Sequence, residues 1–153
     1  MTMIMKKSII ALAALALVAW GCSSGEDESQ PQSAEISIGT DVRPDWQGPN
    51  FDLYEQIMKV EVQIQDTLTQ YVSEADLLCA TINGEVRGVA APRKVEDKWL
   101  FPMTIASNDA DVAVSLSYYC DQLHRIYTIA WTTFDASVAP TGTNGIYKPV
   151  FIK

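Results

Sequence analysis

Most of the chain alternates between apolar and polar residues with a period of two. Met58, Val60 and Val62 alternate with charged or amide side chains. The same rhythm recurs in residues 99–105, 112–120 and 127–133, and residues 147–152 form a further apolar stretch near the C-terminus. A period of two places one side of a stretch against a core and the other in solvent, which is typical of half-buried strands. Pro102 interrupts one stretch, and because proline cannot donate to a neighbouring strand, we expect an edge strand or a bulge there.

The strongest turn signal is the dipeptide Asn83-Gly84. It separates two apolar stretches, residues 77–82 and 85–91. Asn-Gly readily adopts the positive φ angles that a type I′ turn needs at both central positions, so we expect the two stretches to pair as an antiparallel hairpin. A second turn is expected at residues 107–111, where Asn and Asp are frequent.

Helical periodicity is weak by comparison. One short helical stripe is present, formed by Leu68, Tyr71, Val72 and Ala75. Because strong capping residues are missing, we interpret residues 67–75 as one or two helical turns or a structured loop. The whole pattern predicts an all-β fold, an immunoglobulin-like antiparallel β-sandwich of about seven strands, with at most a short helical turn near 67–75.

The N-terminus departs from this pattern. An uncharged apolar run, residues 9–20, follows two lysines and leads to Cys22. A membrane-spanning helix needs about 20 apolar residues, so we interpret this shorter run as a removable targeting segment. It resembles a bacterial lipoprotein signal peptide, although Ala19 stands where leucine is usual. The resemblance implies that Cys22 is the lipidated first residue of the mature chain, acylated for example with palmitate. The alternative is a plain secretory signal that is cut near Ala19 or Gly21.

The residues after Cys22 are acidic and rich in serine. Residues 23–33 contain no large apolar side chain, so the segment cannot bury enough surface to offset its ordering entropy. The acidic cluster resembles the surface-export signal of Bacteroidota lipoproteins, which implies the outer face of the outer membrane; a periplasm-facing anchor is the alternative. We therefore expect a signal peptide at 1–21, an acidic disordered tether at 22–34 and one β-sandwich domain at 35–153.

Removal of the signal peptide increases the negative charge of the chain. It takes away Lys6 and Lys7 and leaves 9 basic and 19 acidic residues, a formal net charge of −10. Nucleic acid is bound by basic surfaces, and attachment to anionic lipid by charge also needs them. We therefore expect no nucleic-acid partner, and contact with the membrane through the N-terminal lipid.

Several short motifs are spread over the expected domain. They are Trp46, Met58-Lys59-Val60, Asp76-Leu77-Leu78, Gly84-Glu85-Val86-Arg87-Gly88-Val89-Ala90, Tyr118-Tyr119-Cys120-Asp121 and Gly142-Thr143 with Pro149. Together they resemble the small β-sandwich modules of Bacteroidota surface lipoproteins. The resemblance implies a fold and a location, and this type of module has no general activity that it would bring with it.

Two cysteines remain once Cys22 is assigned to the lipid. Cys79 and Cys120 both lie in expected strands, in a compartment that permits disulfides. A bridge between them would close a loop of some 40 residues and could stabilise the fold by roughly 3 to 4 kcal/mol. The alternative is a pair of buried free thiols that behave as small apolar side chains.

Groups suited to catalysis or metal binding are scarce. His124 is the only histidine, and no Gly-x-Ser-x-Gly motif accompanies it. Zinc sites need several His or Cys ligands. Asn108, Asp109 and Asp111 could offer oxygen ligands to calcium, although an ordinary Asn/Asp turn is the simpler interpretation. We expect no enzyme activity and no cofactor.

Tryptophan offers a second kind of candidate site. Trp46 lies in a turn-rich stretch and is the candidate for stacking against a sugar, with docking onto the domain as the alternative. Trp99 and Trp131 lie on apolar strand faces, where a place in the core is expected. These features predict a lipid-anchored module at the cell surface that binds a glycan or a protein. The alternatives are a structural or accessory fimbrial subunit and, less favoured, a small hydrolase or a protease inhibitor.

Overall fold

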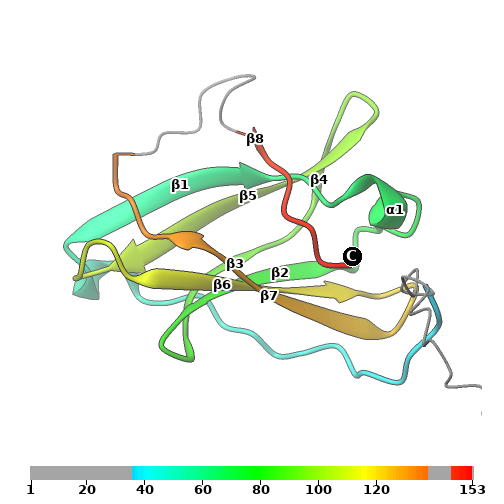
Figure 1. The fold of residues 1–153 in the computed structure, drawn as a ribbon, viewed down its shortest axis with the longest axis horizontal. Helices are drawn as coiled ribbons and strands as arrows, with labels where there is room; N and C mark the ends of the chain where they lie inside the picture. Colours follow the sequence, from blue (N-terminus) through cyan, green and yellow to red (C-terminus); the bar gives the residue numbers. More distant parts are fainter. Residues whose placement is uncertain (1–35, 138–145, 153) are drawn as a thin grey trace, which may run out of the picture. The chain divides into compact units, whose positions relative to one another are not determined.

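Two four-stranded β-sheets face each other in the computed structural model, which describes residues 36–137 and 146–152 (Figure 1). The first sheet has the order β4 (Arg93–Val95), β5 (Lys98–Ser107), β1 (Gln56–Val62) and β8 (Ile146–Tyr147). The second has the order β3 (Glu85–Ala90), β2 (Leu77–Ile82), β6 (Ala113–Cys120) and β7 (Arg125–Thr133). The expected β-sandwich is therefore confirmed. It is not wholly antiparallel, because β8 pairs with β1 in the parallel direction.

The alternation of the sequence decides which side chains form the core. In β1, Met58, Val60 and Val62 are buried, whereas Ile57 and Lys59 are exposed. The largest fully buried side chains come from both sheets and the segments that join them, and include Tyr118, Phe101, Phe134, Met58, Ile64 and Leu68. The inner faces of the two sheets thus supply one shared hydrophobic core.

The expected hairpin is confirmed as β2 and β3. Asn83 and Gly84 have φ angles of 52° and 80°, as a type I′ turn requires. Pro102 lies within β5, but β4 pairs with β5 only as far as Leu100. The missing amide of Pro102 therefore falls where β5 is locally an edge strand, as expected.

Helical structure is limited to short segments. The described residues include one 3-10 turn, η1 (Phe51–Leu53), and one short α-helix, α1 (Asp66–Thr69). The second of these falls at the start of the expected 67–75 segment and confirms a short helical turn there. No helix in the described ranges is both long and apolar enough to cross a membrane.

A β-bulge changes the alternation at the end of β7. Ala130 lies opposite Ser115 and Thr132 lies opposite Val114, which leaves Trp131 as an extra residue. Because Val114 faces the core, Thr132 shares that face and Thr133 is turned to solvent. The regular alternation expected over residues 127–133 therefore does not extend to Thr133, because a period of two does not allow for an inserted residue.

Residues 36–55, which we call the N-terminal strap, follow the second sheet on the side away from the first (Figure 1). Near its start, the amides of Gly39 and Asp41 donate to the carbonyls of Leu123 and His124, at 2.7 and 2.8 Å. Near its end, the amide of Glu55 donates to the side chain of Asn108 at 2.8 Å. The strap is thus fastened at the β6–β7 turn and at the β5–β6 turn.

A buried carboxylate joins three segments at one end of the sandwich. Asp76 is fully buried and accepts four hydrogen bonds. The hydroxyl of Tyr118 donates at 2.6 Å and the amide of Asp121 at 3.0 Å. The amide and hydroxyl of Ser73 donate at 3.2 and 2.9 Å. Asp76 therefore ties the turn before β2 to β6 and to the residue that follows it.

Candidate functional site

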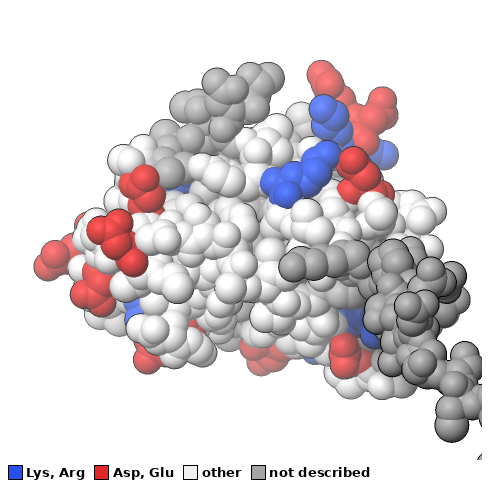
Figure 2. Space-filling model, viewed as in Figure 1, with Lys and Arg blue, Asp and Glu red and all other residues white. Residues whose placement is uncertain are grey.

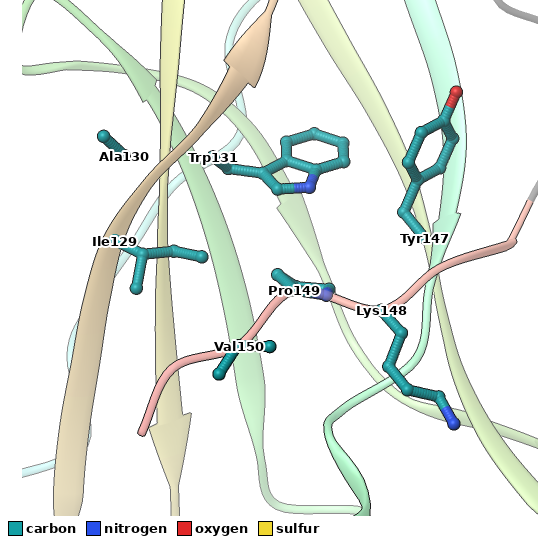
Figure 3. Close-up of a pocket in the computed structure, with 7 residues that line it drawn as sticks. All are labelled: Ile129, Ala130, Trp131, Tyr147, Lys148, Pro149 and Val150. Atoms are coloured by element: carbon teal, nitrogen blue, oxygen red, sulfur yellow. The ribbon is translucent and has the colours of Figure 1, made fainter. Parts of the chain in front are cut away.

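A concave site lies between β7 and the C-terminal segment, and we call it the β7 groove (Figure 3). It has a volume of about 560 Å³ and is open to solvent. Its lining consists of Ile129, Ala130 and Trp131 from β7, and Tyr147, Lys148, Pro149 and Val150 from the C-terminal segment. This volume falls within the range typical of ligand-binding clefts.

An aromatic pair dominates the β7 groove. The rings of Trp131 and Tyr147 have their centroids 5.3 Å apart and are nearly perpendicular, at 89°. In Figure 3 the two rings lie side by side at the groove, and Pro149 lies below Trp131. Bulges frequently re-aim side chains near functional sites, and here the bulged residue is Trp131 itself. The groove therefore offers partly buried aromatic surface that a ligand can contact.

The C-terminal wall of the groove is held in place by Gln65. The side-chain oxygen of Gln65 accepts from the amides of Phe151 and Ile152, at 2.5 and 2.9 Å. Its side-chain amide donates to the carbonyl of Ile152 at 3.1 Å. Pro149 is buried, and the ring of Phe151 lies 5.7 Å from that of Tyr118 in the core. A wall fixed at this many points is largely formed before any ligand binds.

Among the described residues that line the groove, Lys148 is the one that carries a charge. Its ammonium lies 2.9 Å from a carboxylate oxygen of Asp66, and the two side chains are 44% and 82% exposed. Such exposed pairs contribute little to stability because solvent screens them. Figure 2 shows that the centre of this face of the molecule has few charged side chains. The site is therefore mainly uncharged, with a single cation at its edge.

The three tryptophans of the domain lie in different settings. Trp46, the expected sugar-stacking residue, is partly buried in the N-terminal strap and does not line the β7 groove. Trp99 is partly buried against the core, with the Lys94 ammonium 5.8 Å from its ring centroid. Trp131 also packs against the core, as expected, yet it lines the groove as well.

The candidate calcium ligands lie in the turn between β5 and β6. The side-chain oxygen of Asn108 already accepts from the amide of Glu55, and the backbone amide of Asp109 donates to Ser107 at 3.0 Å. Asp111 has a φ of 58°, which places it in a tight turn. No group of three or more His, Cys, Asp or Glu side chains within 36–137 and 146–152 could hold a metal ion. The expected turn is therefore present at these residues, and calcium binding by them stays a prediction.

The expected disulfide is absent, and its absence has a geometric cause. Cys79 and Cys120 are both free and buried. Cys79 lies opposite Ser117 in the β2–β6 ladder, so its side chain is on the outer face of the second sheet. Cys120 shares the inner face with Leu116 and Tyr118, because successive strand residues alternate. Two thiols on opposite faces of one sheet cannot form the bridge that the sequence allowed.

Burial also controls the chemistry of these thiols. It raises the pKa of Cys120, and it raises the pKa of Cys79 from 9.0 to about 11. A group whose pKa is higher in the folded chain stabilises the fold while it stays protonated. Its contribution is complete below pH 9 and is lost as the pH rises towards 11.

The free energy of unfolding is therefore expected to decline between pH 9 and pH 11, the window set by Cys79. Replacing Cys79 with alanine removes one titrating group and should make the decline shallower. Burial also raises the pKa of Tyr118, so part of the decline should remain. Urea unfolding of both chains across this window measures the difference, and equal slopes would contradict the assignment.

His124 has a structural role in the turn between β6 and β7. It is exposed in the turn between β6 and β7, where its φ is 47°. Its carbonyl accepts from the strap amide of Asp41. The position is thus explained by the turn and by the fastening of the strap.

Sequence reasoning did not identify the β7 groove. It placed Trp131 on an apolar strand face and Tyr147 in an apolar stretch near the C-terminus, and both residues do pack against the core. One signal was present, because both aromatic residues flank the Gly- and Thr-rich stretch 140–145 and a connection of this kind can bring its two ends together. That stretch lies outside the described residues.

Comparison with known proteins adds no family to this description. No protein-family model, curated protein or solved structure matches the chain. The geometry of the β7 groove is therefore the basis on which a function is proposed.

Proposed function

We propose that this protein is a lipid-anchored binding module at the cell surface, which holds its ligand in the β7 groove without catalysing a reaction. Cys22 supplies the lipid anchor, and residues 22–34 form the tether on the outer face of the outer membrane. The domain then acts by being held where its ligand is encountered. The proposal combines the targeting signal of the sequence with a concave site of suitable size in the described domain.

The observation that carries this proposal is the aromatic pair in an open groove with a fixed wall. Trp131 and Tyr147 present partly buried rings, and aromatic residues of this kind supply much of the binding energy at interfaces. The groove is bounded by β7 on one side and by the segment held by Gln65 on the other. A site of this form favours binding of an extended ligand over enclosure of a small substrate.

Strand order supports an immunoglobulin-like assignment within the same proposal. Immunoglobulin domains place strands A, B, E and D in one sheet and C, F and G in the other, to which variable domains add C′. If β1 corresponds to strand B, then β2 to β7 correspond to C, C′, D, E, F and G, and both sheets keep the immunoglobulin order. The place of strand A beside B is taken by β8, which runs parallel to β1.

Replacing Trp131 with alanine is expected to weaken ligand binding by tenfold or more, since truncating a central aromatic residue costs roughly 2 kcal/mol. The mature chain is screened against a glycan array and a displayed peptide library, and the affinity of each ligand found is remeasured with the variant. Trp46→Ala is the matched control, because Trp46 is also partly buried but lies outside the groove. Thermal melting confirms that both variants fold. Binding that depends on Trp46 and not on Trp131 would show that the groove is not the site.

The anchor is tested by replacing Cys22 with serine. The variant cannot be acylated at this position, so it should fail to incorporate a palmitate analogue and should leave the membrane fraction. Protease added to intact cells should degrade the unaltered protein if the domain faces outwards. Retention of the Cys22→Ser chain in the membrane would refute the lipid anchor, and protection from protease would place the domain in the periplasm.

A further inference from the structure

The outer edge of β7 has no strand partner among the described residues. Within residues 36–137 and 146–152, β7 is the last strand of the second sheet and pairs only with β6. An open strand edge presents a row of backbone amides and carbonyls to which another extended chain can bind. Three residues of this strand, Ile129, Ala130 and Trp131, also line the β7 groove. The open edge and the groove are therefore parts of one surface.

The regular alternation of antiparallel hydrogen bonds identifies the free backbone groups. The amide of Ile126 points away from β6, because it donates to the carboxylate of Asp41 at 2.8 Å. The hydroxyls of Ser117 and Thr128 are 2.8 Å apart, as expected of a closely spaced pair without backbone hydrogen bonds. The amides and carbonyls of Thr128 and Ala130 therefore point outwards too, and neither residue has a backbone partner on that side within the described ranges.

The strap closes one end of this edge and leaves the other open. The amide of Ile126 already donates to the carboxylate of Asp41. The backbone groups available to another chain therefore begin at Thr128 and continue to the groove residues of β7. A chain that pairs with Thr128 and Ala130 would have neighbours on the inner face of the sheet, Ile129 and Trp131. Its alternate side chains would pack against these two residues, as neighbouring strands do.

Charge defines a second feature of the ligand. Lys148 is the only charged residue among those that line the groove, in a chain that is strongly acidic overall. Its exposed contact with Asp66 is weak enough to exchange for another carboxylate. A ligand with a single negative group at this end of the groove would complement Lys148. The net negative charge of the chain repels a ligand that is acidic along its whole length, so the complementarity is confined to the position beside Lys148.

We infer that the occupant of the β7 groove is an extended peptide segment of a partner protein. It adds to the edge of β7 through Thr128 and Ala130, packs an apolar side chain beside Trp131 and directs an acidic side chain to Lys148. This inference rests on the proposed binding function and names the ligand class of the same site.

The test begins with selection of linear peptides from a random phage-displayed library against the complete mature chain. Selected peptides are resynthesised with a methyl group on one backbone nitrogen at a time. Because only alternate amides of an added strand face β7, methylation should weaken binding by tenfold or more at every second position and leave the positions between them nearly unchanged. This pattern requires no change to the protein, so it does not depend on the folding of a variant.

A matched pair of lysine variants tests the charge. Lys148→Gln should weaken the binding of an acidic peptide severalfold, and the loss should diminish at high salt because screening reduces the contribution of the charge. Lys98→Gln removes an exposed lysine at the start of β5, outside the groove, and should leave the affinity unchanged. Equal effects of the two variants would refute a specific role for Lys148.

Three results would overturn the inference. Methylation effects without alternation would exclude strand addition, and dimerisation of the pure chain that selected peptides disrupt would assign the edge to a second copy. Binding of glycans alone, with loss on Trp131→Ala, would exclude a peptide ligand but leave the proposed binding function intact. Failure of both screens would instead count against the binding function itself, so the two failures are distinguishable.

Discussion

Replacing Asp76 with alanine is expected to lower the free energy of unfolding by about 4 kcal/mol, a large effect for a single substitution. Four donors lose their acceptor in this variant: the Tyr118 hydroxyl, the Asp121 amide, and the amide and hydroxyl of Ser73. Because Asp76 is fully buried, water cannot replace the carboxylate without opening the site. The unsatisfied donors, rather than the lost apolar contacts, determine the size of the effect.

Two stacked tyrosines provide a matched comparison for this prediction. Tyr118 and Tyr127 have ring centroids 6.2 Å apart and nearly parallel planes. The hydroxyl of Tyr118 donates to Asp76, whereas the buried hydroxyl of Tyr127 has no partner among the described residues. Tyr118→Phe should therefore cost about 2 kcal/mol, because it removes a hydrogen bond to a charged group. Tyr127→Phe should be neutral or slightly stabilising, since it removes a polar group that is buried without a partner.

Urea unfolding of the three variants and the unaltered chain tests the network directly. The expected order of destabilisation is Asp76→Ala, then Tyr118→Phe, then Tyr127→Phe with almost none. Both tyrosine variants delete one oxygen from similar aromatic surroundings, so a difference between them reports the hydrogen bond. Equal losses for the two tyrosine variants would show that the Tyr118–Asp76 contact does not stabilise the fold.

Local features of this fold were predictable from the sequence because short-range chemistry decides them. Asn83-Gly84 specifies its own turn, and the two flanking stretches need only pair with each other. Met58, Val60 and Val62 are buried as their alternation requires. The number of sheets follows from the same rhythm, because several half-buried strands must cover one another's apolar faces.

The position of the β7 groove and the absence of a disulfide both depend on the register between strands that are distant in the sequence. Local sequence patterns do not determine that register. Whether Cys79 and Cys120 meet depends on which face each occupies once β2 and β6 pair. The β7 groove depends on a bulge at Trp131. It also depends on the C-terminal segment, whose backbone is hydrogen-bonded by the side chain of Gln65, more than 80 residues earlier in the chain. Composition identified the aromatic residues, but only the register of the ladders brings Trp131 and Tyr147 together.

Gly88 lies where β3 comes close to β5 of the opposing sheet. It belongs to the Gly-Glu-Val-Arg-Gly-Val-Ala motif and lies in β3, next to a register shift opposite Ala80 and Thr81. A Cβ atom at this position would lie 2.5 Å from the backbone carbonyl oxygen of Thr104, in β5 of the opposing sheet. Glycine is therefore required here for close packing of two backbones, and neither partner is a flexible side chain that could move aside.

Replacing Gly88 with alanine is accordingly expected to destabilise the domain by about 3 kcal/mol, the upper part of the range for overpacked cores. Gly48→Ala is the matched control, because a Cβ there would meet no atom within 4 Å and its φ lies outside the left-handed region. That change should be neutral or should stabilise by up to about 1 kcal/mol, since alanine restricts the unfolded chain. Thermal and urea unfolding of both variants measure the contrast. Similar small effects of the two substitutions would contradict this prediction. They would mean that β3 and β5 can move apart at Gly88 with little loss of folding free energy.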